Sequence, residues 1–344
     1  MDYRKLGHSD LEASVLSFGT ATFGGGTPFF KAWGETGVAE ATRLVDIARD
    51  AGVNLFDTAD QYSDGLSETI LGRAIAGRRG DLLIATKAAG RTGPGDDDIG
   101  TSRKHLIAAC EASLRRLGTD VIDLYQMHWF DGLTPVEETL RGLGDLVAAG
   151  KVRYVGCSNF SGWHLMKSLA LAGEHDLPRY VTHQAHYSLL SREYEWELMP
   201  LAHDQGLSTL VYSALSGGKL SGRIRRGREA PEGSRTARLK ARVEDEMPAA
   251  QFFDLMDVLD TVAAEVGSGV AQVAMNWILH RPTVGSVILG ARDEAQLVEN
   301  LRVLDFRLSD DQVLRLDRAS ARRPIYPYWH QRELTSERNP TPTR

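Results

Sequence analysis

The sequence predicts an α/β fold in which eight strands alternate with eight helices, the (β/α)8 or TIM barrel. Eight short apolar runs, most of them bounded by Gly or polar residues, are typical of buried strands. They begin near Val15, Val53, Leu82, Val121, Val152, Tyr180, Ser208 and Gly285. The segments between them have helical periodicity, and eight strand-then-helix units are the number that closes such a barrel.

The first inter-strand segment illustrates the helical pattern. Its apolar residues recur at helical spacing from Val38 to Ala48, and Gly52 follows just before the next apolar run. A glycine at that point is the residue that most readily caps a helix C-terminus. Glycines at 118, 150 and 206 predict similar helix ends before later strands.

The spacing of the strands predicts an insertion. Successive starts lie 28 to 39 residues apart, but the last interval is 285 − 208 = 77 residues. The excess lies around residues 217–250, which we expect to form a long loop after strand seven. A doubly wound sheet is the alternative, but it would need a Gly-x-Gly-x-x-Gly turn after its first strand, and residues 19–26 lack that spacing.

The two ends of the chain lie outside the repeat. Tyr3–Lys5 and Leu11–Val15 flank a Gly-His-Ser-Asp turn, which predicts a hairpin that plugs the bottom of the barrel. We expect residues 1–321 to form one barrel domain. Residues 322–344 contain four prolines beside Tyr326, Tyr328 and Trp329, and are predicted to be a C-terminal loop or tail.

Composition limits the classes of function. The 344 residues include 46 acidic and 40 basic side chains, a net charge of −6, so no basic excess favours nucleic acid. Two cysteines, Cys110 and Cys157, are too few for a disulfide framework and favour a reducing compartment. No apolar run is long enough to cross a membrane. We expect a cytoplasmic protein; the oligomeric state stays open.

The insertion carries a basic cluster with two interpretations. Lys219 and four arginines, of which Arg223 is the first, occur before any acidic residue of the segment. Most charge runs are solvated surface segments, which is one interpretation. The other is a phosphate site, because loops after strands seven and eight of such barrels commonly bind phosphate.

Three consecutive strands place ionisable side chains at one rim. Strand two closes at Asp57, with Tyr62 five residues later; strand three closes at Lys87 and strand four at His128. The carboxyl ends of barrel strands face the active site. A lysine ammonium beside a phenol favours the phenolate and lowers its pKa from about 10, and an aspartate would hold that lysine. With the imidazole orienting a carbonyl oxygen, the group suits proton transfer to a carbonyl.

Motifs over nearly the whole chain carry a family resemblance. The chain resembles the aldo-keto reductase family in Asn54–Tyr62 with Ser67-Glu68 and Leu71-Gly72, Thr86-Lys87, Asp123–His128, Gly150–Arg153, Gly156–Phe160, Gln184–Leu190, Gly290–Arg292, Gln296-Leu297 and Glu299-Asn300. The resemblance implies hydride transfer between NADP(H) and an aldehyde or ketone, or the corresponding alcohol. It also implies that Tyr62 is the general acid, with Asp57, Lys87 and His128 as the other catalytic residues.

The resemblance further implies a cofactor site and a substrate site. Candidate cofactor residues are Gly19, Thr20, Asp57, Ser158, Asn159, Gln184, Tyr212, Ser213, Leu215, Gly217, Lys219, Arg223, Arg235, Gly290, Arg292, Gln296, Glu299 and Asn300. Candidate substrate residues are Trp33, Tyr62, His128 and Trp129. Arg292 matches a position near the adenosine 2′-phosphate and favours NADP(H). Gly290-Ala291 and the neighbouring acid Asp293 depart from the family pattern and leave NAD(H) as the alternative.

Two other classes of function stay open at this point. Barrels similar to this one serve as β subunits of voltage-gated potassium channels with little turnover, so a cofactor-binding regulatory subunit is one alternative. A hydrolytic metal barrel is the other. His183 and His186 are its nearest candidates, but no carboxylate or cysteine completes a ligand set, and we expect no metal.

Overall fold

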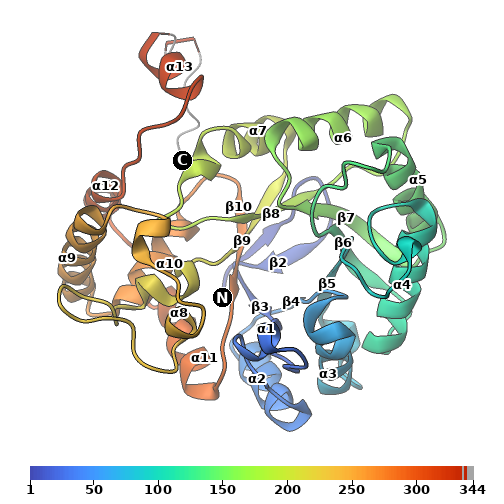
Figure 1. Cartoon of the computed structure of the whole chain (residues 1–344), viewed down its shortest axis with the longest axis horizontal. Coiled ribbons are helices and arrows are strands. Elements are labelled where there is room, and N and C mark those ends of the chain that lie inside the picture. The colour runs from blue at the N-terminus through green and yellow to red at the C-terminus, as the bar shows by residue number, and fades with distance from the viewer. Residues whose placement is uncertain (335–336, 339–344) are drawn as a thin grey trace.

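The computed structural model describes residues 1–334 and 337–338. Eight parallel strands form a closed barrel in the order β10-β3-β4-β5-β6-β7-β8-β9, with helices around it (Figure 1). They are β3 (Leu16–Gly19), β4 (Leu55–Asp57), β5 (Leu83–Ala88), β6 (Ile122–Met127), β7 (Val152–Ser158), β8 (Thr182–His186), β9 (Ser208–Tyr212) and β10 (Val284–Leu289). The predicted (β/α)8 fold is confirmed.

The helices follow the strands in the predicted alternation. Those of the barrel are α2 (Val38–Asp50), α3 (Leu66–Ala74), α4 (Arg103–Leu117), α5 (Val136–Ala148), α6 (Gly162–Glu174), α7 (Leu198–Gln205), α10 (Val270–Leu279) and α11 (Glu294–Leu301). Gly52 follows α2 with a positive φ of 89°, as expected of a glycine that ends a helix. None of the helices within the described residues has the length and apolar character of a membrane span.

The N-terminal hairpin closes the bottom of the barrel. Strands β1 (Tyr3–Lys5) and β2 (Glu12–Ser14) pair antiparallel, as predicted. Leu6, Leu11 and Ala13 of the hairpin pack in one cluster with apolar residues of the strands, namely Leu55, Ala85, Leu124 and Leu210, and with Val181 just before β8. This apolar floor forms a second core, separate from the one between strands and helices, and fills the end of the barrel opposite to the carboxyl ends of the strands.

The insertion after the seventh barrel strand, β9, is present and folded. It contains α8 (Arg235–Arg238) and α9 (Ala249–Val266), besides a 3-10 turn at Ser216–Ser221. Two of its arginines make ion pairs with α9: Arg225 with Asp260 at 2.7 Å and Arg226 with Asp254 at 2.5 Å. These pairs explain part of the basic run as packing of the insertion onto its own helix.

The tail differs from the expected loop because it includes a helix. After α12 (Asp310–Ala319), the chain runs away from the barrel to α13 (Tyr328–Leu334), which stands off from the body of the fold (Figure 1). Tyr326 is exposed, and Tyr328 lies near Trp196 with ring centroids 6.4 Å apart. The prolines stop α12 but leave room for one short helix before the end of the described residues.

Candidate active site

Strand alternation places the polar residues of the site. Along a strand, every second side chain points to the same face. Asp57, Lys87 and Gln126 each lie two residues after an apolar floor residue, namely Leu55, Ala85 and Leu124. The barrel interior therefore changes from apolar at the bottom to polar at the carboxyl ends of β4, β5 and β6.

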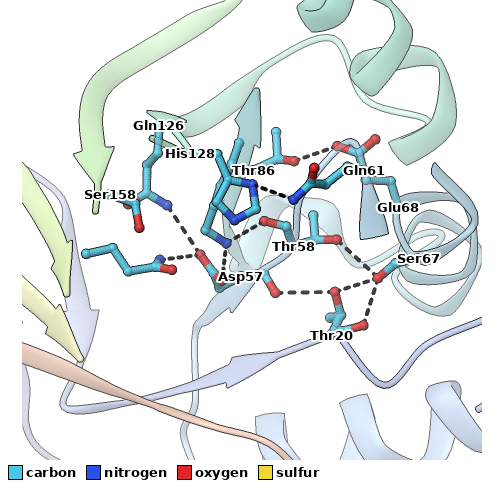
Figure 2. Close-up of polar contacts among 12 residues, drawn as sticks. Thr20, Asp57, Thr58, Gln61, Ser67, Glu68, Thr86, Gln126, His128 and Ser158 are labelled. Carbon is cyan, nitrogen blue, oxygen red and sulfur yellow. Dashed lines mark hydrogen bonds and ion pairs between the residues drawn. The ribbon is translucent and has the colours of Figure 1, made fainter. Parts of the chain in front are cut away.

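Asp57 is the centre of a buried hydrogen-bond network (Figure 2). Its Oδ1 accepts from Lys87 Nζ at 2.5 Å, and its Oδ2 accepts from Gln184 Nε2 at 2.8 Å and Gln126 Nε2 at 3.3 Å. Lys87 also donates to the Thr58 carbonyl oxygen at 2.8 Å. Both oxygens of a buried carboxylate thus have donors, which such a charge requires.

Lys87 is a fully buried cation beside Tyr62. Its Nζ lies 5.1 Å from the centroid of the phenol ring, and its side chain is 0% exposed. Burial acts to lower the pKa of Lys87, but the Asp57 carboxylate and the Tyr62 phenol outweigh it and raise that pKa above 10.5. The ammonium is therefore a permanent positive charge, and it stabilises a phenolate at Tyr62 over the neutral phenol.

A tight backbone turn fixes the position of Tyr62. Ser63, Asp64 and Gly65 all have positive φ, 50°, 56° and 84°. The Ser63 hydroxyl donates to the Phe23 carbonyl oxygen and accepts from the Gly25 amide, both at 2.9 Å. Such left-handed residues persist where surrounding contacts hold them, so the loop after β3 fixes the turn that carries the phenol.

His128 is held next to Tyr62 as a neutral imidazole. The two ring centroids lie 5.8 Å apart, and Gln61 Nε2 lies 3.3 Å from His128 Nδ1 (Figure 2). Burial lowers the pKa of His128 to about 3, and the charge of Lys87 adds to the effect. Near neutral pH the ring therefore has one N–H donor, which suits it to bind a carbonyl oxygen.

Asp60, two residues before Tyr62, is a second buried carboxyl. Within the described residues neither of its oxygens has a hydrogen-bond partner. Burial raises the pKa of Asp60 to about 8, with the nearby Glu68 carboxylate adding to the shift. The Asp60 side chain is thus mainly protonated at neutral pH.

Of these residues, Asp57, Gln61, Tyr62 and His128 line one end of a cavity of about 1040 Å³. Most predicted site residues line it: Gly19, Trp33, Asp57, Tyr62, His128, Ser158, Asn159, Gln184, Tyr212, Ser213, Leu215, Gly217, Arg223, Gly290, Arg292, Gln296, Glu299 and Asn300. The volume lies at the upper end of the range for ligand sites, so the cavity has room for more than a small substrate.

Four other predicted residues do not line the cavity. Lys87 is fully buried and contacts Asp57 and the Tyr62 ring. Thr20 is buried, with its hydroxyl 2.9 Å from Ser67 Oγ. Trp129 stacks on His128 with centroids 4.8 Å apart.

Lys219 is the fourth, and it is buried in an ion pair with Glu246 at 2.7 Å. Lys219 was predicted to contact a phosphate of the cofactor. In the structure its charge is instead paired with a carboxylate of the same insertion. The side chain of Arg235 lies outside the described part of the structure.

Several residues that line the cavity were not predicted from the sequence. Phe29 and Phe30 form an aromatic wall beside Tyr62, with the Phe30 and Tyr62 centroids 6.3 Å apart. Residues 269–272 and Met275, at the start of α10, line the cavity near Glu299. Gln126, although not a lining residue, could have been found from its alternation with Leu124 and His128; the others depend on how loops fold back over the barrel.

The far end of the cavity combines an unpaired cation with open backbone. Within the described residues, the Arg292 guanidinium has no hydrogen bond or ion pair. Gly217 and Gly218 turn with positive φ, and a side-chain carbon at Gly217 or Gly290 would meet no atom within 4 Å. A half-buried cation beside backbone that a ligand can approach closely fits the phosphates of a dinucleotide.

No group of three His, Cys, Asp or Glu residues that could hold a metal occurs among the residues that the structure describes. The groups at the mouth of the barrel are instead a tyrosine, a paired lysine and a neutral histidine. A (β/α)8 barrel with this group beside a long cavity defines the class of protein as a barrel oxidoreductase.

Comparison with known proteins identifies the family. The Aldo/keto reductase family profile matches residues 15–321. The chain is 36% identical to the uncharacterized oxidoreductase YrpG of Bacillus subtilis, covering 92% of this chain and 94% of that protein, and 34% identical to protein tas of Escherichia coli, covering 92% and 97%. A probable voltage-gated potassium channel subunit beta of rice (Oryza sativa subsp. japonica) is 35% identical, covering 89% and 92%. The chain belongs to the aldo/keto reductase family.

Proposed function

We propose that this protein is a cytoplasmic, NADP(H)-dependent carbonyl reductase, or the reverse alcohol dehydrogenase, with Tyr62 as general acid and base. The observation that carries the proposal is the Lys87 ammonium, held by Asp57 at 2.5 Å and lying 5.1 Å from the Tyr62 ring. A positive charge fixed beside a phenol is the arrangement that lets tyrosine give up a proton near neutral pH.

The residues of the chain would act as follows. The His128 N–H donates to the carbonyl oxygen and orients it, while Tyr62 delivers its proton to that oxygen. Lys87 stabilises the phenolate that remains, and Asp57 keeps Lys87 charged and in place. When bound, the nicotinamide supplies or accepts the hydride. Phe29, Phe30 and Trp33 supply an apolar wall for the rest of a small substrate.

Arg292 favours NADP(H) over NAD(H) because its guanidinium is free to pair with a 2′-phosphate. Within the described residues the neighbouring Asp293 forms no ion pair with that guanidinium, since its carboxylate accepts from the Gln296 backbone amide at 2.8 Å and caps α11. Gln296 in turn accepts from the Arg292 backbone amide at 3.0 Å. Ser158, Asn159, Gln184 and the Tyr212 ring are the proposed nicotinamide contacts, with Glu299 and Asn300 at the adenine.

The test is Tyr62→Phe, which removes only the phenol oxygen. We expect turnover of a carbonyl panel with NADPH to fall by at least about 10²-fold, as loss of a general acid does, while NADPH binding, measured by tryptophan quenching, is unchanged. A variant that keeps most of its rate would refute the assignment of the acid.

A second candidate function rests on the named relatives. Two of them, from rice and from Arabidopsis thaliana, are called probable voltage-gated potassium channel subunit beta. A regulatory subunit would bind NADPH tightly and turn over no carbonyl of the panel. Measurable steady-state turnover that depends on Tyr62 would instead support the reductase.

A further inference from the structure

Gln61 is a polar residue of the cavity that the catalytic scheme above leaves unused. It directly precedes Tyr62, lines the cavity, and places its side-chain Nε2 3.3 Å from His128 Nδ1 (Figure 2). A neutral imidazole has one N–H and one acceptor nitrogen, and the hydrogen bond made by one nitrogen decides which of the two it is. The partner of Nδ1 therefore determines whether His128 can donate from Nε2.

Other contacts hold both the backbone and the ring of His128 in place. The His128 backbone amide donates to the Ala88 carbonyl oxygen at 2.8 Å, and its carbonyl oxygen accepts from Asn159 Nδ2 at 3.0 Å. The ring stacks on Trp129 with planes 27° apart. With backbone and ring both held, the remaining variable is the position of the hydrogen on the ring.

Gly90 leaves open the space that the Gln61 amide occupies. A side-chain carbon built on Gly90 would lie 2.2 Å from Gln61 Oε1 and 2.9 Å from Cδ. The amide oxygen therefore packs where any other residue would have a side chain, and the NH₂ group faces His128. Ala89, just before Gly90, has a φ of 121°, a region that non-glycine residues rarely occupy. Such strain beside a site persists where the surroundings enforce it.

We propose that Gln61 is a positioning residue that fixes the tautomer of His128. Its Nε2–H donates to Nδ1, so the ring hydrogen is on Nε2, the nitrogen left to meet a ligand in the cavity. Gly90 supports this arrangement because only glycine leaves room for the amide. The inference rests on the proposed carbonyl reduction for its consequence, but the tautomer itself can be measured without turnover.

The first test is ¹⁵N NMR of histidine-labelled protein, with the His128 signals identified by their loss in His128→Ala. We expect the Nε2–H form in the wild type at pH 7 and a mixture of tautomers in Gln61→Met. Gln205→Met, which removes an amide from the end of α7, is the matched control and should leave the His128 signals unchanged. An Nδ1–H ring in the wild type, or an unaltered Nε2–H ring in Gln61→Met, would overturn the proposal.

The second test displaces the Gln61 side-chain amide by a substitution at Gly90, and leaves Gln61 and His128 themselves unchanged. Gly90→Ala should lower kcat/KM about as much as Gln61→Met, roughly tenfold to hundredfold, somewhat less than the loss of a whole oxyanion donor. In the double variant the two losses should not add, since both act through one contact. Gly132→Ala is the control because a side-chain carbon there meets no atom within 4 Å. If the losses in kcat/KM of the two single variants added fully in the double variant, Gly90 and Gln61 would not act through the same contact with His128.

The third test uses the charge of the variant. In Gln61→Glu a carboxylate faces Nδ1, so it should accept a hydrogen bond from Nδ1–H, stabilise the protonated ring and raise the pKa of His128. We expect its pH–rate profile to gain an ionisation near neutrality that the wild type lacks. A profile identical to that of the wild type would count against the proposal. A changed tautomer in a protein without any carbonyl turnover would instead support the proposal and contradict the proposed function.

Discussion

The two ends of the cavity are built in opposite ways. At the Tyr62 end, the charge of Lys87 is buried and matched by Asp57, and every partner comes from a barrel strand or the turn after it. At the far end, the Arg292 guanidinium, just before α11, makes no hydrogen bond or ion pair within the described residues, and loops of the insertion line the same cavity. The barrel thus supplies a buried ion pair beside Tyr62, the proposed general acid, whereas the loops supply a cation without an internal counter-charge.

This contrast predicts that the strand-built end is sensitive in stability as well as in activity. In Lys87→Met, Asp57 is left buried without its cation, so we expect a loss of about 3–5 kcal/mol in the free energy of unfolding and a loss of catalysis larger than for any other single change described. Adding Asp57→Asn should restore most of the stability but none of the turnover. Chemical denaturation and kinetics measure the two effects, and full stability of Lys87→Met would remove the claimed role of the pair.

The buried carboxyl of Asp60 gives the same end a pH dependence. Its pKa is about 8 in the folded protein and 3.8 in a free side chain, so the folded state holds a proton that the unfolded state has lost between these values. Stability therefore falls as pH rises through this window, by on the order of 1 kcal/mol per pH unit. Asp60→Asn does not titrate, so the free energy of unfolding of the wild type relative to this variant should decline from pH 5 to pH 8. A constant difference would contradict the raised pKa.

The loop-built end should respond only in affinity. In Arg292→Ala we expect NADPH binding to weaken by roughly tenfold to hundredfold, the value of one charge-assisted contact, with NADH binding and the unfolding midpoint unchanged. Arg225→Ala is the control, because Arg225 is paired with Asp260 on α9. Equal weakening of NADPH and NADH binding would place the 2′-phosphate elsewhere.

The sequence alone determined the repeat and the facing of its strands. Eight apolar runs predict the barrel, and alternation along β4, β5 and β6 puts Asp57, Lys87 and His128 on the interior, because strand periodicity is a local property of the chain. The family motifs, from Asn54 to Asn300, could likewise be recognised without coordinates, and the family profile matches residues 15–321.

Only the tertiary structure decided which of these groups meet. Gln184 reaches Asp57 across 127 residues of sequence, since barrel closure brings β8 opposite β4. Lys219 forms an ion pair with Glu246 because the insertion folds back on itself. The Thr20 hydroxyl forms a hydrogen bond with the Ser67 hydroxyl. Periodicity fixes the face on which a side chain lies, but its partner depends on the path of the loops and on the closure of the barrel, which no local pattern encodes.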